Sequence, residues 1–154
     1  MPGRIPWIER KFVFDFPADH YPEITERLRG TPARVEFRLE NVPADILNLR
    51  HEDAWSIQEH IGHLLDLDPL FLGRLEDFEA GLETLRPADM TNRKTEEARH
   101  NEKMLSTILS AFKEERARIV RHLEALPPEA FARTALHPRL KTPMRLVDSA
   151  CFQP

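Results

Sequence analysis

The chain has one cysteine and no long apolar run, and these two shortages exclude several classes of protein. Because Cys151 has no second thiol to pair with, no internal disulfide forms, which fits a reducing cytoplasm. No apolar stretch approaches the roughly 20 residues of a membrane-spanning helix, and MPGRIPWIERKF lacks the apolar core of a signal peptide. We therefore expect a soluble, cytoplasmic protein with no membrane partner.

Positive charge is not in excess either. The 26 Asp and Glu residues outnumber the 22 Lys and Arg residues, which gives a formal net charge of -4, and the basic residues are scattered among acidic ones. A surface that binds nucleic acid needs contiguous positive charge, so we expect no nucleic acid partner. The five glycines form no phosphate-binding loop, and no G-x-S-x-G motif marks a nucleophilic serine.

A length of 154 residues corresponds to one domain, which we place at 1–154. Residues 1–17 combine prolines with the alternating segment FVFDF, which predicts an extended arm that lies across the body. In an extended arm Phe12, Phe14 and Phe16 all point to one side, because successive side chains alternate between the two faces.

From Asp19 onward, apolar residues recur at intervals of three and four, which predicts helices. Thr31 and Pro32 resemble a cap and the first turn of a new segment, so we expect the first helix to consist of two stacked pieces, at about 19–29 and 32–41.

Two longer helices follow. Ser56 and Glu59 match a capping box, which predicts a helix that starts at 55–56 and runs to Gly81, bent but not broken at Pro69. A third helix is predicted from Thr95 to the proline pair after residue 126, with Met104 on its apolar face.

The fourth predicted helix is short. Thr142 and Pro143 again resemble a cap and first turn, Met144 and Val147 begin an apolar stripe, and the sequence then ends at Pro154. Together these segments predict an all-α protein: an up-down four-helix bundle with an extended N-terminal arm and a shortened fourth helix, which leaves its partners' apolar faces partly uncovered.

Two histidines in WSIQEHIGHL are the strongest candidates for a site. His60 and His63 lie about 60 degrees apart around a helix, so both can face one cleft. A stable transition-metal site needs three or four ligands, and Glu59 and Asp66 are the nearest carboxylates. The spacing matches neither HExxH nor the Glu-x-x-His of di-iron bundles. From spacing alone, the cluster is either part of a metal site or the polar flank of a half-exposed helix.

The remaining histidines give no site. His137 is expected in a structural role, with a ring nitrogen bonded to a backbone carbonyl, and Cys151 has no nearby basic motif to activate its thiol. Four others near segment ends or on charged faces are expected to be solvated: His20, His51, His100 and His122.

Four stretches in order carry a family resemblance: FDFPADHYPEITERLRGTPARVE, WSIQEHIGHLLDLDPLF, ADMTNRKTEEARHN and HPRLKTPMRLVD. Over nearly its whole length the chain resembles the DinB-like superfamily, bacterial proteins that include the YfiT-like metal-dependent enzymes. The resemblance implies a four-helix bundle, often a homodimer, with a divalent metal, zinc or nickel, held by three histidines. The first of these lies eight residues after the tryptophan of the second helix, which here is His63.

The other two ligands of the family form a His-x-x-x-His pattern in the last helix, and this sequence contains neither. We therefore expect a chain truncated or frame-shifted in its fourth helix, which on its own is metal-free and inactive unless His60, Glu59 or Asp66 supplies replacement ligands.

Two functions remain open. The first is a metal-dependent hydrolase or thiol transferase of the DinB type, with His63 as a ligand and Glu59 or Asp66 as residues that orient it. The second is a non-catalytic interaction module, or a decayed paralogue, that self-associates as a homodimer through the apolar strip beside the short helix. A DNA-associated role rests on the family name alone, and the acidic balance opposes it.

Overall fold

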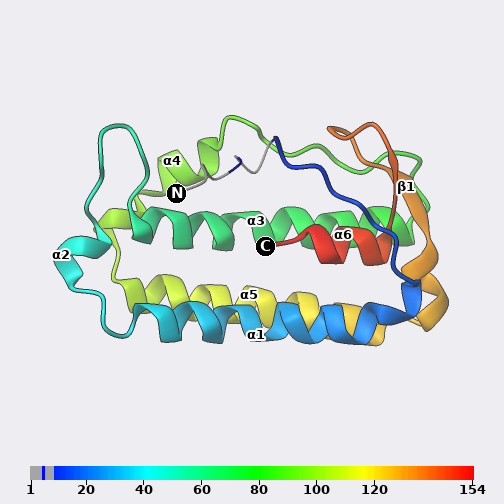
Figure 1. The fold of residues 1–154 in the computed structure, drawn as a ribbon, viewed down its shortest axis with the longest axis horizontal. Helices are drawn as coiled ribbons and strands as arrows, with labels where there is room; N and C mark the ends of the chain where they lie inside the picture. The colour runs from blue at the N-terminus through cyan, green and yellow to red at the C-terminus, as the bar shows by residue number, and fades with distance from the viewer. Residues whose placement is uncertain (1–4, 6–8) are drawn as a thin grey trace.

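Four helices lie side by side and form the body of the protein (Figure 1). In the computed structural model, which describes residue 5 and residues 9–154, they are α1 (Tyr21–Leu39), α3 (Ile57–Glu79), α5 (Leu105–Ala125) and α6 (Leu146–Phe152). The shorter elements are η2 (Ala18–His20), α2 (Ala44–Leu47), α4 (Arg93–Ala98), η3 (His100–Glu102), η4 (Pro128–Ala132), β1 (Thr134–Leu136) and β2 (Pro143–Arg145). The predicted all-α four-helix bundle is confirmed. None of the described helices is long and apolar enough to cross a membrane.

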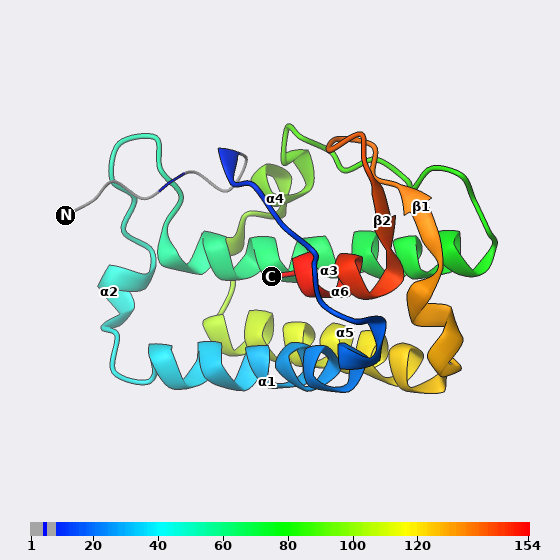
Figure 2. The same ribbon diagram turned by 45° about the vertical axis from the view of Figure 1, so that its right-hand side comes forward.

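The directions of the helices differ in one respect from a strict up-down order. Gln58 near the start of α3 donates to the Lys103 carbonyl before α5 at 2.7 Å, and Glu79 at the end of α3 meets His122 near the end of α5 at 2.6 Å. α3 and α5 therefore run in the same direction, while α1 and α6 run in the opposite one. The reason is the connection 80–104, which returns along the length of the bundle before α5 begins (Figures 1 and 2).

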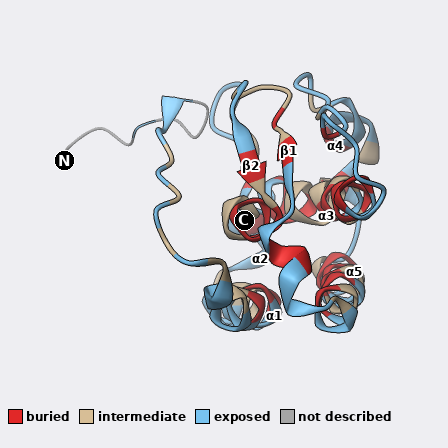
Figure 3. Cartoon of the chain, turned by 90° about the vertical axis from the view of Figure 1, so that its right-hand side faces the viewer, coloured by how far each residue is buried: buried red, intermediate tan, exposed pale blue. Residues whose placement is uncertain are grey.

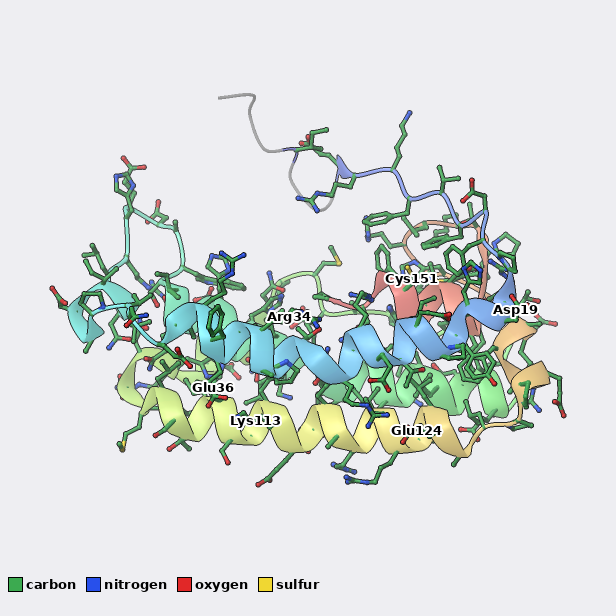
Figure 4. All side chains as sticks on the ribbon, turned by 60° about the horizontal axis from the view of Figure 1, so that its bottom comes forward. Asp19, Arg34, Glu36, Lys113, Glu124 and Cys151 are labelled. Atoms are coloured by element: carbon green, nitrogen blue, oxygen red, sulfur yellow. The ribbon has the colours of Figure 1, made fainter. Side chains whose placement is uncertain are left out.

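The core lies between the inward faces of these helices (Figure 3). α1 packs along α5, where Lys113 contacts Glu36 at 2.7 Å and Arg29 contacts Glu124 at the surface (Figure 4). Exposed pairs of this kind contribute little stability, so burial of apolar side chains holds the bundle together. The main cluster includes Leu28, Phe71, Leu75, Phe78, Ile119, Leu123 and Phe131.

α3 begins at the predicted capping box. Ser56 Oγ accepts from the Glu59 backbone N–H at 3.1 Å, and the Glu59 carboxylate accepts from the Ser56 N–H at 2.8 Å. The helix continues through Pro69 as a single element to Glu79. The capping box therefore fixes the register of the helix that carries His63.

The predicted division of the first helix is wrong. α1 runs unbroken from Tyr21 to Leu39 with Pro32 in its interior. Proline removes the N–H that would bond to the carbonyl four residues earlier. Here that carbonyl, on Leu28, accepts instead from Arg116 Nη1 of α5 at 3.4 Å. A tertiary contact thus supplies the partner that the proline cannot.

The predicted third helix is also divided. Arg99 has a left-handed backbone (φ 52°) that ends α4, Lys103 is extended, and α5 begins only at Leu105. Met104, expected on the apolar face, is 73% exposed. The break allows α4 to pack on α3 while α5 takes its own place in the bundle.

The start of the fourth helix is displaced. Pro143–Arg145, predicted as a first helical turn, pairs antiparallel with Thr134–Leu136. α6 therefore starts at Leu146, where the Asp148 carboxylate accepts from the Arg145 N–H at 2.9 Å. Its seven residues confirm a shortened fourth helix.

The arm is extended as predicted, with residues 1–4 and 6–8 lying outside the described part of the chain. Phe12, Phe14 and Phe16 are half-buried, whereas the residues between them are exposed. The Phe12 ring packs edge-on against Phe152 of α6 (4.6 Å between centroids), and the Phe16 carbonyl accepts from Arg145 at 2.8 Å. The arm therefore covers α6 (Figure 2).

Candidate functional site

His63 lies on α3 with its ring against α4. Its Nδ1 is 3.0 Å from Thr95 Oγ1, and the Thr95 hydroxyl donates to Asp66 Oδ2 at 3.0 Å. His63 and Asp66 come from adjacent turns of α3, whereas Thr95 comes from the connection that returns along the bundle. The parallel order of α3 and α5 therefore helps to build this site, because it requires the connection to pass over α3.

These contacts fix the proton on the His63 ring. A hydroxyl has one proton to donate. Because Thr95 gives that proton to the Asp66 carboxylate, its oxygen accepts from His63 Nδ1–H. The lone pair of the neutral ring then lies on Nε2, which has no hydrogen-bond partner among the described residues. Burial lowers the pKa of His63, although Asp66 opposes this effect, so the ring is neutral at pH 7.

His100 completes the cluster, and the prediction that it is solvated is wrong. It is 1% exposed, and its Nε2 donates to Asp66 Oδ2 at 2.8 Å. The ring packs directly on Gly62, where an added Cβ would overlap its atoms. Its Nδ1 is buried and has no hydrogen-bond partner within the described part of the chain. Asp66 is therefore held by two donors, one from Thr95 and one from His100.

The other two candidates on α3, Glu59 and His60, have partners outside the Asp66 cluster. The Glu59 carboxylate binds the Arg50 guanidinium (2.8 Å) as well as the Ser56 N–H, and the Arg50 hydrogen bond lowers the pKa of Glu59 to about 2. His60 is exposed and packs edge-on against Trp55, 5.5 Å between ring centroids. Glu59 is thus engaged away from His63, whereas His60 and His63 both lie against the Trp55 ring.

A cavity of about 420 Å³ opens beside His63. One face of α3 lines it through residues at helical spacing: His63, Leu67, Leu70 and Arg74. The opposite walls are residues 87–90, the turn at 137–139 and the end of the chain from Phe152 onward. The cavity is therefore mainly apolar, with His63 near one end and a basic group near the other.

His137 and Arg74 form the basic end. His137 is buried, and its Nδ1 accepts from the backbone N–H groups of Arg139 (3.2 Å) and Leu140 (3.1 Å). We expected the His137 ring to bond to a backbone carbonyl. Instead, the ring accepts hydrogen bonds from backbone N–H groups. Burial, with the Arg74 and Arg139 charges, lowers the pKa of His137 to about 4, so this ring is also neutral at pH 7.

The sequence matches a known family. The profile of the DinB superfamily matches residues 27–150. The chain belongs to the DinB superfamily. The match begins inside α1 and extends into α6. It includes His63 and the cavity-lining residues up to Arg139, but not Phe152, Gln153 and Pro154.

A solved structure has the same fold as this DinB chain. YfiT from Bacillus subtilis, described as a probable metal-dependent hydrolase with an unusual four-helix bundle topology, matches with a TM-score of 0.72. The two sequences are 19% identical, and the match covers 94% of this chain and 83% of YfiT. Among curated proteins, none matches the sequence.

The donor atoms of this DinB chain do not fit a divalent metal held by three side chains. His63 Nε2 is suited to a metal, but Asp66 Oδ2 already accepts from Thr95 and His100, and the Glu59 oxygens accept from Arg50 and the Ser56 cap. Within the described residues, no group of three His, Cys, Asp or Glu side chains is placed to hold an ion. His60, Glu59 and Asp66 thus do not replace the absent His-x-x-x-His pair.

The other predicted residues lie outside the cluster. His20 and His51 are exposed as expected, while His122 is half-buried and meets Glu79. Cys151 is half-buried on α6.

Sequence reasoning missed three residues of the site: Thr95, His100 and Arg74. The only sequence signal for Arg74 was its position eleven residues after His63, on the same helical face. Thr95 reaches the site from α4, and His100 reaches it through the left-handed turn at Arg99 that ends α4; periodicity does not reveal that turn.

Proposed function

We propose that this chain is a small-molecule-binding member of the DinB superfamily, of the hydrolase or thiol transferase class, with His63 as the reactive group of its cavity. The observation that carries the proposal is the state of His63. Its ring is neutral, its Nδ1–H is held by Thr95 and Asp66, and its Nε2 lone pair is left without a partner at a cavity wall.

Such an imidazole has two uses. It can accept a proton from a thiol or water in the cavity, and the Asp66 carboxylate, acting through Thr95, then stabilises the imidazolium. In thiol transfer, the sulfur attacks an electrophilic carbon as its proton passes to Nε2, and the leaving group departs with the bonding electron pair. His63 is also the one of the three metal-binding histidines implied by the DinB resemblance that this chain contains, and we propose it for that role as well.

The metal role is limited by the donor set. Divalent zinc or nickel, the ions implied by the resemblance, would polarise a substrate or activate bound water or thiol. The nearby carboxylates of Asp66 and Glu59 already accept hydrogen bonds from protein donors. We therefore expect His63 to be the one protein ligand of the metal, and these 154 residues to bind the metal weakly.

The test is the reaction of cysteamine with 1-chloro-2,4-dinitrobenzene, alongside hydrolysis of 4-nitrophenyl acetate, each with EDTA and with added Zn²⁺ or Ni²⁺. We expect the chain to accelerate one of the two reactions, and His63→Gln to reduce that acceleration at least tenfold. His51→Gln, at an exposed position, is the matched control. A gain that needs metal assigns His63 as a ligand, and one that persists in EDTA assigns it as a base. Equal rates for the wild type and His63→Gln would contradict the proposal.

We also propose self-association as a homodimer, for which the exposed apolar side chains at the α2 end give support. Phe37 is 69% exposed, and Ile46 and Leu49 are exposed at the same end of the bundle. Light scattering coupled to size exclusion at several concentrations tests this proposal. A dimer weakened by Phe37→Ser is expected, and a monomer at every concentration counts against it.

A further inference from the structure

The basic end of the cavity contains a buried arginine without an ion-pair partner. Arg74 is 8% exposed, and no carboxylate of the described residues lies within ion-pair distance of it. Its Nε donates to the Arg86 carbonyl at 3.1 Å. A cation removed from water without a counter-charge is strongly unfavourable. Burial accordingly lowers the pKa of Arg74.

An acidic group on the same helix, Asp77, opposes the effect of burial on the pKa of Arg74 but offsets the charge only in part. Asp77 is already bound by Arg86, which donates to it from its backbone N–H (2.8 Å) and its Nη2 (2.8 Å). Asp89 lines the cavity, but its oxygens accept from Thr91 and from the Arg93 N–H. The guanidinium of Arg74 is therefore left facing the cavity.

His137 presents a second donor to the same place. Because its Nδ1 accepts two backbone N–H groups, the single proton of the neutral ring lies on Nε2. That Nε2 is 3.4 Å from Arg74 Nη1. Two N–H groups then face each other with no acceptor between them. One oxygen placed beside both would accept from both, and Arg139, which lines the same end, adds a further positive charge.

We propose that Arg74 and His137, with Arg139, form a binding site for the oxyanion of a small molecule, either a carboxylate or a phosphate. Charge-assisted hydrogen bonds from a guanidinium suit both groups. The apolar stretch between the two ends, from Leu67 and Leu70 to Phe152, would contact the hydrocarbon part of the ligand.

The length of the cavity constrains that ligand further. His63 and Arg74 are eleven residues apart on α3, which corresponds to about 16 Å along the helix axis. The preferred ligand is therefore elongated, with its anion at Arg74 and its reactive group toward His63. This orientation rests on the proposed function of His63, whereas the anion site does not.

The test compares hexanoate, hexyl phosphate and the neutral isostere hexanamide by isothermal titration at constant ionic strength. We expect at least one anion to bind at least tenfold more tightly than hexanamide. Whichever anion binds more tightly identifies the group, and equal binding of both still supports a general oxyanion site. Arg74→Gln should abolish the preference, while Arg118→Gln, an exposed arginine on α5, should keep it.

A preference below threefold in the wild type, or an unchanged preference in Arg74→Gln, would overturn the inference and leave Arg74 as a support for the Arg86 carbonyl. Should Arg74→Gln fail to fold, Arg139→Gln carries the test, with a loss of at least threefold expected and no loss contradicting it. His63→Gln should keep the preference, so failure of the His63 chemistry and failure of the anion site give different results.

Discussion

Gly62 sets how closely His100 can approach α3. The imidazole lies where a Cβ on residue 62 would be, and it is fully enclosed by protein. Gly62→Ala should therefore push His100 away from Asp66 and destabilise the protein by about 1–3 kcal/mol, as overpacking does in other cores. Urea denaturation measures the change.

The matched control is Gly30→Ala, also a helix-interior glycine. There the added methyl meets only the flexible, exposed side chain of Arg34, which can rotate away. Alanine is the better helix former, so this variant should gain about 1 kcal/mol. Similar effects of the two variants would mean that His100 does not depend on Gly62.

Glu59 gives a pH dependence whose sign follows from its partners. Its pKa falls from 4.5 to about 2 on folding, chiefly through the Arg50 hydrogen bond. A lowered carboxyl pKa stabilises the folded state above the unfolded pKa, and this stabilisation is lost as pH falls through the folded pKa. Glu59→Gln should thus cost about 1–3 kcal/mol at pH 7, with the difference from wild type disappearing between pH 4.5 and about 2.

Urea denaturation across that pH range, with the exposed Glu97→Gln as control, provides the measurement. A difference between wild type and Glu59→Gln that stays constant down to pH 2 would show that Glu59 acts through packing and not through its charge.

At the level of single residues, the sequence predicted local contacts and missed distant ones. The Ser56–Glu59 box was predictable because both partners lie within one turn. The burial of His100 was not, since it depends on a glycine 38 positions earlier in the chain and on a carboxylate of the same helix. His63 was selected by resemblance, and its Thr95 partner comes from another element.

At the level of elements, a buried ion pair joins three helices. Asp68 of α3 and Arg116 of α5 are almost fully buried, 3.0 Å apart, and Arg116 also reaches the Leu28 carbonyl that Pro32 leaves unbonded in α1. Removal of one member of such a pair leaves an uncompensated charge. Arg116→Met should therefore destabilise the protein by about 3–5 kcal/mol.

A double variant separates charge from packing. Burial raises the pKa of Asp68, and loss of Arg116 should raise it further. Asp68→Leu combined with Arg116→Met should be more stable than Arg116→Met alone, with a residual loss of about 1–3 kcal/mol from the Leu28 carbonyl left without a donor. Exposed Arg118→Met should change little. A double variant no better than Arg116→Met would show that the pair acts through shape and not through charge.

The same contact explains why the prediction for α1 failed. Periodicity and proline rules describe an isolated helix, and Pro32 would destabilise an isolated helix by removing a backbone hydrogen bond. The predicted helix start at Thr142-Pro143 was wrong for a related reason, because Pro143–Arg145 pairs as a strand with Thr134–Leu136. Elements whose signals were local, such as the capped start of α3, were predicted correctly.

At the scale of the whole molecule, the end of α6 forms one wall of the cavity, and the arm packs on that wall through Phe12. Phe12 packs on Phe152, Phe152 lines the cavity, and Arg145 ties the arm to the start of α6. The number of bundle helices could be predicted from the sequence. The contact between the arm and α6 could not, because it joins residues far apart in the chain. The stability of α6 therefore depends on residues more than a hundred positions away.

Phe12→Ala tests that dependence. It removes an edge-on aromatic contact of about 0.5–1.5 kcal/mol beyond the loss of buried area, so backbone amides of α6 should exchange with deuterium about tenfold faster. Amides of α5, which is not part of the Phe12–Phe152 contact, should be unchanged. Val13→Ala, next in the chain but 77% exposed, is the matched control and should leave both helices unchanged. Faster exchange throughout the bundle would indicate global destabilisation, and no change in α6 would show that the arm does not hold this wall in place.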